Sequence, residues 1–333
     1  MQIAVDAMGG DYAPDEIVAG AILAAQELDA CICLTGDPDA IDAHMTSEVL
    51  AGRLEVKPAS DVIAMGESPR SVLRGRDDTS MARAVDLVGS GTAQAVFSAG
   101  NSGAFMALSA MRLGTIPGVK RPAIAVTMPN DGGHRVLLDA GANADCKPEH
   151  LVDFGLMGSV YAEYALGIDN PRVGLLSIGE ERSKGNELTK AAHELLAAAD
   201  LNFCGNVEGG DIYADTCDVV VCDGFVGNVV LKVTEGVAGL VYRQLAQAVL
   251  ADEQLRGVAS HLEEAFSSVS ELFDASEYGG ALLLGVNGVS IVGHGCSDAR
   301  AARNAIRFAH RAVEGRLVEQ LSDVFAQRAE MTA

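Results

Sequence analysis

Short apolar runs alternate with segments of helical periodicity along most of the chain. The runs Gln2–Val5, Ala95–Ser98 and Val173–Ser177 are each followed by a polar, glycine-containing loop and then by a segment with helical spacing. A run of this length suits a buried strand, and apolar residues three and four apart suit one face of a helix. Strands that alternate with helices build a mostly parallel sheet covered on both faces. The sequence therefore predicts an α/β fold, an α/β/α sandwich formed by a single domain over residues 1–333.

The same reading gives the expected elements. The expected strands are Gln2–Val5, Cys31–Leu34, Leu54–Val56, Ala95–Ser98, Ala123–Met128, Arg135–Leu138, Val173–Ser177, Asp218–Val221 and Ser290–Val292. The expected helices are Pro14–Leu28, Thr79–Val88, Gly103–Arg112, Pro148–Leu166, Asn186–Ala198 and Ala299–Glu314.

One region, residues 225–273, interrupts the alternation with helical periodicity alone. One apolar stripe extends from Val226 to Leu245 and a second from Leu255 to Phe273. This spacing predicts a long antiparallel helical pair. Either both stripes are buried within the protomer, or part of the pair projects and makes contacts outside it.

The net charge and the cysteine content limit which binding partners and which cellular compartment are expected. The net charge of −22 repels nucleic acid and anionic lipid unless a local basic patch opposes it, so no nucleic-acid partner is expected. Seven cysteines without CxxC spacing indicate neither a disulfide framework nor a metal site, which favours a cytoplasmic location. The uncharged stretches Val88–Met111 and Tyr278–Ser297 contain several glycines and are interpreted as buried strands with tight loops, not as membrane spans.

Glycine-rich loops follow several of the expected strands. They are Asp6–Asp11 with Gly9 and Gly10, Ser98–Gly103 with Asn101 and Ser102, Asp139–Asp145 with Asn143, and Asp223–Asn228. Backbone N–H groups in such turns suit phosphate, and ligands bind at the carboxyl ends of strands in parallel sheets. None of these loops is a GxGxxG fingerprint or a P-loop, so each loop has a structural interpretation as well as a functional one.

Three further groups of side chains are candidates for chemistry. Lys184 stands in a loop between a strand and a helix that begins near Asn186, where a cation can neutralise phosphate or an oxyanion. His294 and Cys296 could form a nucleophilic pair, although a free cysteine is more often structural. Arg303 and Arg307 lie on one helical face with Arg300 and Arg311, and this stripe either pairs with acidic residues of the same protein or docks an acidic partner.

Seven motifs in order resemble those of one family. They are Asp6–Asp11, Ser98–Ala104, Gly141–Cys146, Ile178–Glu181 with Lys184–Glu187, Gly205–Gly209, Cys222–Asn228, and Tyr278–Gly280 with Leu284–Gly288. Together they resemble the bacterial phosphate:acyl-[acyl-carrier-protein] acyltransferases over essentially the whole chain. This sequence departs from the family in three places: Ser102 replaces threonine, Cys296 replaces serine, and Leu282 replaces a proline in what is expected to be a loop.

The resemblance implies a fold, a reaction and partners. The fold would be related to those of phosphotransacetylase and isopropylmalate dehydrogenase, and the protein would be a homodimer that uses no metal, nucleotide or other cofactor. The reaction would convert acyl-acyl carrier protein and inorganic phosphate into acyl phosphate, reversibly, for phospholipid synthesis. The product would pass to a membrane glycerol-3-phosphate acyltransferase, so a location peripheral to the inner membrane is a further expectation.

The reaction and the resemblance together suggest residue roles. Lys184 and Asn228 are expected to be catalytic, because the thioester is already activated and mainly requires positioning and oxyanion stabilisation. Substrate would be bound by Asp6, Gly9, Gly10, Asp11, Asn101, Ser102, Gly103, Asn143, Asn186 and Asp223, and the carrier by Arg303 and Arg307. The acyl tail would lie along the helical pair, and Leu255, Val258 and Leu262 are the expected tip residues of any membrane contact.

Two other functions are weighed against this one. A decarboxylating NAD-dependent dehydrogenase of related fold would need a dinucleotide loop and clustered arginines and aspartates, which the sequence does not show. A non-catalytic, membrane-peripheral scaffold would bind vesicles without releasing free carrier protein in the presence of phosphate.

Overall fold

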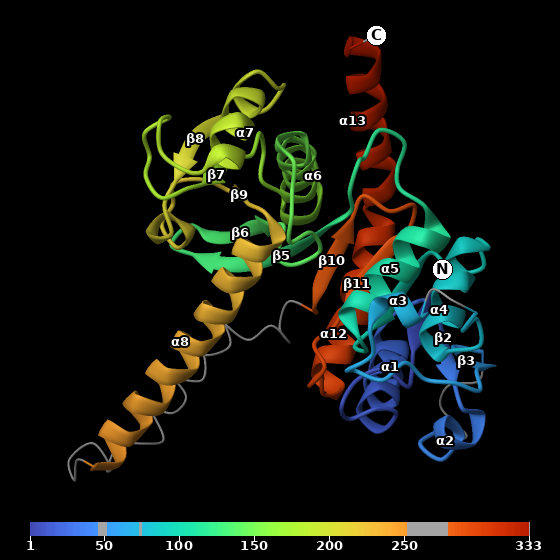
Figure 1. Ribbon diagram of the computed structural model, residues 1–333. Helices are drawn as coiled ribbons and strands as arrows, with labels where there is room; N and C mark the ends of the chain where they lie inside the picture. Colours follow the sequence, from blue (N-terminus) through green and yellow to red (C-terminus); the bar gives the residue numbers. More distant parts are fainter. Residues whose placement is uncertain (46–51, 73–74, 252–278, 333) are drawn as a thin grey trace.

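One mixed sheet of eleven strands runs through the whole molecule. The computed structural model describes residues 1–45, 52–72, 75–251 and 279–332 (Figure 1). The strand order is β3-β2-β1-β4-β11-β10-β5-β6-β9-β7-β8. The strands are β1 (Gln2–Asp6), β2 (Cys31–Gly36), β3 (Leu54–Pro58), β4 (Ala95–Ser98), β5 (Ala123–Asn130), β6 (Gly133–Leu138), β7 (Val173–Leu176), β8 (Phe203–Val207), β9 (Val219–Val221), β10 (Ala281–Leu284) and β11 (Val289–Val292).

The sheet consists of two parallel halves joined by antiparallel strands. β1, β2, β3, β4 and β11 pair in parallel, and so do β6, β7, β8 and β9. At the centre β10 is antiparallel to both β11 and β5, and β5 is antiparallel to β6. The two parallel halves therefore run in opposite directions, and each half gathers its own loops at the carboxyl ends of its strands.

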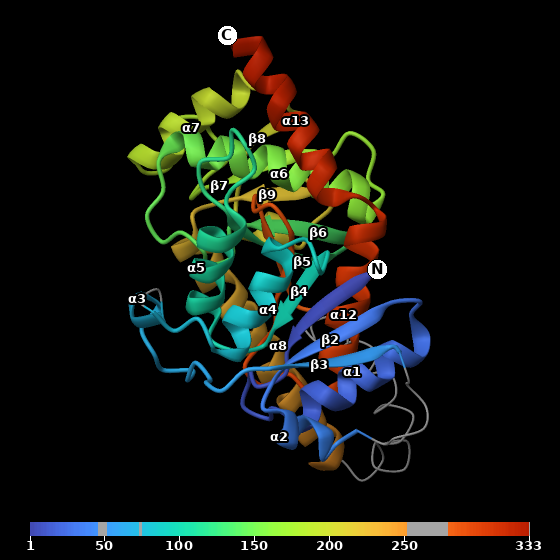
Figure 2. The ribbon, with the colours of Figure 1, turned by 90° about the vertical axis from the view of Figure 1, so that its right-hand side faces the viewer.

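Helices cover both faces of the sheet. They are α1 (Asp15–Glu27), α2 (Pro38–Asp42), α3 (Pro69–Val72), α4 (Ser80–Gly89), α5 (Ser102–Leu113), α6 (Pro148–Leu166), α7 (Glu187–Ala197), α8 (Gly224–Ala251), α12 (Ala299–Glu314) and α13 (Leu317–Thr332), with a short 3₁₀ turn at Gly210–Ile212. Successive strand residues point to opposite faces. In β4, Val96 packs with α4 and α5 while Phe97 packs in the core shared with α1 and α12. The predicted α/β/α sandwich is confirmed, and the two halves with their covering helices are visible as separate lobes (Figure 2).

Several elements were not expected from the sequence: the strands β8 and β10, the long helix α13, the short helices α2 and α3, and the 3₁₀ turn. Leu282, expected in a loop, lies instead within β10, where it is 2% exposed and pairs with Ala125 of β5. The uncharged stretch 88–111 forms the end of α4, strand β4 and most of α5, as predicted.

Helix α8 is the first member of the predicted helical pair. The last residue of α8 that the structure describes is Ala251. The second stripe and the proposed tip residues Leu255, Val258 and Leu262 lie outside the described residues. α8 projects away from both lobes (Figure 1), and among the described helices it alone is long and apolar enough to cross a membrane by length and composition. Only 11% of its most apolar window is buried, so most of its apolar side chains are exposed in the part of the chain that the structure describes.

Candidate functional site

The first group of loops lies at the carboxyl ends of β1, β4 and β11. Asp6, the last residue of β1, is buried, and its carboxylate accepts a hydrogen bond from the Ser98 hydroxyl at 2.7 Å. Burial raises the pKa of Asp6. A Cβ at Gly9 would lie 2.5 Å from Asp6 Oδ2 and 2.9 Å from the Gly100 amide nitrogen, so only glycine fits there. Asp6 thus supports the loop from beneath, although the sequence suggested that it lines the site.

The loop after β1 also contacts the loop after β11. The Asp11 amide donates to the Gly295 carbonyl at 2.7 Å, and Gly10 has a φ of +119°, a conformation that favours glycine. In the β11 loop, the Cys296 thiol lies 3.0 Å from His294 Nδ1. The thiol and imidazole suspected from the sequence are therefore adjacent and exposed.

Asn101 fixes the start of α5. Its Oδ1 accepts the Ala104 amide at 3.0 Å, which caps the helix. Its Nδ2 donates to the carbonyls of Met65 and Glu67 at 2.9 and 2.8 Å. All of these contacts are internal, whereas the neighbouring Ser102 is exposed and its hydroxyl can face a ligand.

The second group of loops is built around Asp139, which follows β6. Its carboxylate accepts five N–H groups at 2.8–3.0 Å: the amides of Ile124, Gly141, Ala142 and Asn143, and the Asn143 side chain. Burial raises the pKa of Asp139, although these donors oppose the shift. Asn143 also donates to the Pro122 carbonyl at 2.8 Å. Sequence reasoning assigned Asn143 to the site but overlooked Asp139, which organises the loop.

Helix α8 begins directly against this loop. The Asp223 carboxylate accepts the Val226 amide at 2.9 Å. A Cβ at Gly227 would overlap the Asp139 carbonyl oxygen, so glycine allows the helix to approach the loop closely. The next residue, Asn228, is exposed and lies over Gly141, where an added Cβ would meet the Asn228 side chain at 3.7–3.8 Å.

Lys184 stands in a turn beyond the end of β7. Its side chain is exposed and passes over Gly179, where an added Cβ would meet Lys184 Cγ at 2.8 Å. Asn186 caps α7, because its Oδ1 accepts the Thr189 amide at 2.9 Å. β9 lies between β6 and β7, so Lys184 and Asn228 follow the carboxyl ends of neighbouring parallel strands.

One contact joins the two groups of loops. Lys232, one turn along α8 from Asn228, places its Nζ 3.4 Å from Nε2 of His294 in the β11 loop. Lys232 also pairs with Glu235 at 3.2 Å. The periodicity of α8 gave no signal for this lysine, because a single cation on an apolar helix looks like an ordinary surface residue.

The predicted docking arginines both contact one carboxylate. Arg303 and Arg307 of α12 lie 3.5 and 3.6 Å from the two oxygens of Glu27 at the end of α1. Both distances are long for ion pairs, and exposed pairs of this kind stabilise a fold little. The Glu27 contact supports internal pairing, while the exposed part of Arg307 leaves a cation available to a partner.

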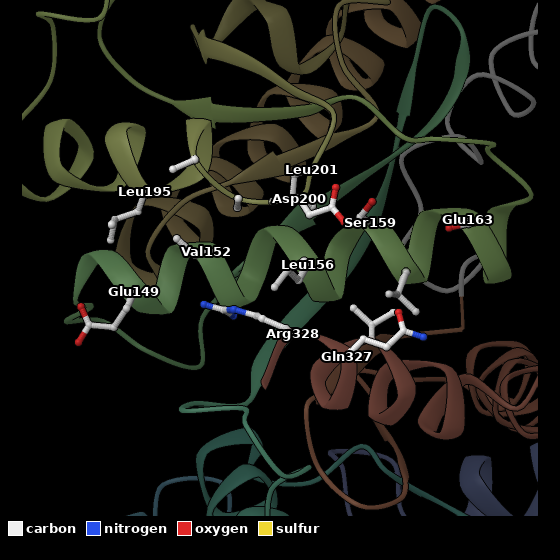
Figure 3. A pocket seen from close by; sticks show the side chains of 14 residues that line it. Glu149, Val152, Leu156, Ser159, Glu163, Leu195, Asp200, Leu201, Gln327 and Arg328 are labelled. Atoms are coloured by element: carbon white, nitrogen blue, oxygen red, sulfur yellow. The ribbon is translucent and has the colours of Figure 1, made fainter. Parts of the chain in front are cut away.

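A separate groove of about 570 Å³ lies between α6, α13 and the end of α7 (Figure 3). Val152, Leu156 and Leu201 contribute to its apolar lining, and Glu149 and Glu163 lie toward its two ends. None of the residues predicted for the site lines this groove. Among the residues that the structure describes, no group of three or more His, Cys, Asp or Glu side chains is arranged to hold a metal ion.

Comparison with known proteins identifies close relatives. Residues 1–320 match the model of a family described as "Fatty acid synthesis protein". A phosphate acyltransferase of Desulfitobacterium hafniense is 48% identical over 322 residues, 96% of each chain. A phosphate acyltransferase of Thermodesulfovibrio yellowstonii is 49% identical over 333 residues, 99% of this chain and 96% of the relative.

Solved structures share the fold at low sequence identity. A phosphotransacetylase from Streptococcus pyogenes superposes with a TM-score of 0.61 and 17% identity over 94% of each chain. A putative 4-hydroxythreonine-4-phosphate dehydrogenase from Salmonella typhimurium gives a TM-score of 0.51 and 12% identity over 93% of this chain and 99% of the other. These matches confirm the predicted relation to phosphotransacetylase and dehydrogenase folds. They support the dehydrogenase alternative at the level of fold alone.

Proposed function

Because the chain belongs to the phosphate acyltransferase family, we propose that it transfers a fatty acyl group from acyl carrier protein to inorganic phosphate. The acyl phosphate would serve phospholipid synthesis. Identity of nearly half over almost the full length of these relatives is the observation that favours this reaction over the dehydrogenase and scaffold alternatives.

The chemistry requires little from the protein beyond positioning and charge. A phosphate oxygen attacks the thioester carbonyl, the tetrahedral oxyanion collapses, and the carrier leaves as a thiolate. A thiol with a pKa of about 8.5 departs readily at neutral pH. The enzyme must therefore hold phosphate beside the carbonyl and stabilise the oxyanion.

Lys184 and Asn228 are the proposed catalytic residues. The Lys184 ammonium would neutralise phosphate or the oxyanion, and the Asn228 amide would donate a hydrogen bond to the same oxygen. Their exposure, and their position after neighbouring parallel strands, supports this pairing. The fixed backbone on which Asn228 rests further supports it, because preorganised donors need no rearrangement during the reaction.

The remaining predicted residues take supporting or binding roles. Gly9, Gly10 and Asp11 would form a backbone cradle with Ser102 and Gly103. Asp6, Asn101, Asn143, Asn186 and Asp223 would act through the loops and helix starts that their side chains hold.

The partners follow from charge and from exposed apolar surface. Arg303 and Arg307 would steer the acidic carrier toward a protein whose overall charge opposes it. The exposed apolar side chains of α8 would pack against a second copy in a homodimer and provide cover for the acyl tail. The protein would be cytoplasmic and peripheral to the inner membrane, where the glycerol-3-phosphate acyltransferase receives the product.

The direct test is to incubate the pure protein with acyl-acyl carrier protein and phosphate, and to measure acyl phosphate and free carrier thiol. Both should appear in equal amounts and only with phosphate. Lys184→Ala should keep the fold and lower turnover by roughly a hundredfold, the scale of losing one oxyanion partner. Near-parental turnover in a folded Lys184→Ala variant would remove Lys184 from the mechanism, and the absence of acyl phosphate with the parent protein would refute the reaction.

A further inference from the structure

A buried asparagine holds the turn that carries Lys184. Asn206 lies in β8 and is 7% exposed, and its Nδ2 donates to the Glu181 carbonyl at 3.0 Å. The same carbonyl accepts the Lys184 amide at 2.9 Å. The oxygen that closes the Lys184 turn is therefore also the oxygen that ties the turn to the sheet.

His193 of α7 sets the orientation of the Asn206 amide. Its Nδ1 lies 2.9 Å from Asn206 Oδ1. Because Nδ2 of Asn206 donates to a carbonyl, Oδ1 must accept, so Nδ1 of His193 carries the proton. The imidazole packs edge-on against the Phe203 ring, with centroids 5.1 Å apart. A helix, a strand and an aromatic side chain thus hold this amide in one orientation.

A second side-chain contact, an ion pair at the surface, also connects the turn to α7. Arg182 pairs with Glu194 of α7, with Nε 2.8 Å from Oε1, but both side chains are more than half exposed. Water and salt weaken such a pair, and it fixes geometry poorly. The Asn206 bond is protected by burial, so it is the stronger restraint on the backbone of the turn.

We propose that Asn206, oriented by His193, is a positioning residue that aims Lys184 at the reacting phosphate. This role rests on the proposed function of Lys184. Asn206 does not touch substrate; it acts by fixing the Glu181 carbonyl, and through it the position of the Lys184 backbone. Loss of the bond would let the turn shift, and a shift of about 1 Å in a group that stabilises charge can cost up to a hundredfold in rate.

The test is a double-mutant cycle on Asn206 and Lys184. Asn206→Ala should lower kcat/KM by about tenfold to a hundredfold in the parent background. In the Lys184→Ala background the same change should have almost no further effect, because the group that it positions is gone. Any loss of thermal stability should be the same in both backgrounds. A loss of kcat/KM by the same factor in both backgrounds, or none in a folded Asn206→Ala variant, would overturn the proposal.

Matched variants separate positioning from general disruption. Asn202→Ala removes another amide-to-carbonyl bond beside β8, from Asn202 Nδ2 to the Asn170 carbonyl at 2.9 Å, and should leave kcat/KM unchanged. If Asn206→Ala fails to fold, His193→Ala is the alternative, because it keeps the Asn206 amide but no longer fixes its orientation. His193→Ala should lower kcat/KM in the parent background and have almost no effect in the Lys184→Ala background.

Hydrogen exchange separates this proposal from the catalytic role of Lys184. The Lys184 amide proton should exchange faster in Asn206→Ala, whatever Lys184 does in the reaction. If Lys184→Ala is fully active while this exchange accelerates, the catalytic assignment fails and the structural restraint stands. If exchange is unchanged, Asn206 does not hold the turn and the positioning role is refuted.

Discussion

Gly227→Ala tests whether the close contact between α8 and the Asp139 loop positions Asn228. A Cβ at this position would overlap the Asp139 carbonyl oxygen and lie 2.9 Å from its carbonyl carbon and 3.0 Å from Cys222 Sγ. Carbon atoms prefer separations of about 3.5–4.0 Å, so the start of α8 must move by roughly 1 Å. Alanine in a helix normally gains up to about 1 kcal/mol over glycine, but overpacking of this kind costs about 1–3 kcal/mol.

Two measurements follow from that displacement. The melting temperature should fall by about 2–10 °C, and turnover should fall about a hundredfold because Asn228 is the next residue. Gly209→Ala is the control: its backbone is already helical at φ −58° and ψ −31°, and an added Cβ meets nothing within 4 Å. The control should keep parental activity and equal or higher stability. Parental turnover and melting temperature in Gly227→Ala would refute the link between this contact and the site.

Two further predictions concern the partners. The double variant Arg303→Glu with Arg307→Glu should raise the KM for the carrier and leave the KM for phosphate unchanged. Glu27→Gln should lower the KM for the carrier, because it frees both arginines from their ion pairs. If the KM for the carrier is unchanged in these variants, the arginines serve only as internal ion-pair partners. Val233 and Val237 are both more than half exposed on α8. Replacing both with glutamate would place charges in an interface formed by α8, so the double variant should sediment as a monomer. A dimer that persists would place the interface elsewhere.

Strong local signals made much of the fold predictable. The bounds of β4, α6 and α12 match the predicted ones, since each element has sharp ends in the sequence. Asp298 caps α12 by accepting the Ala301 amide at 2.8 Å, and a proline begins α6 while Gly167, in a left-handed conformation, ends it. These ends depend on residues within a few positions of one another, which sequence reasoning can detect.

The missed strands depend on partners that are distant in the chain. β8 contains Gly205 at φ +101° and an irregular register with β7, so its five residues do not alternate as a regular strand does. β10 is short, and its antiparallel pairing with β5 joins residues more than 150 positions apart, as in Leu282 with Ala125. Local periodicity carries no information about strand direction, so the reversal between the two halves of the sheet could not be predicted.

The same limit applies to the site. Lys184 and Asn228 are candidates from the sequence because their side chains can do chemistry, whereas Asp139 and Asn206 contact backbone groups that fold beside them. Asp139 accepts hydrogen bonds from residues on both sides in sequence, including Ile124 of the neighbouring strand. Asn206 donates to a carbonyl 25 residues earlier. A sequence motif does not reveal such bonds, because the atoms that the side chain contacts belong to the backbone, which is the same at every residue.

The two halves of the sheet each contain a buried aspartate beneath a loop, but the hydrogen-bond donors around the two carboxylates differ. In each half a buried aspartate at the end of a strand supports a glycine loop: Asp6, the last residue of β1, lies beneath Gly9, and Asp139, directly after β6, lies beneath Gly141. Asp139 is surrounded by five N–H donors, which can stabilise a negative charge in place of water. Asp6 accepts a side-chain hydrogen bond from Ser98, while its Oδ1 is buried without a partner, so its loss of solvent is compensated less. The loop beside Asn228 is therefore the more rigidly defined of the two, which is what a site that stabilises charge by fixed dipoles requires.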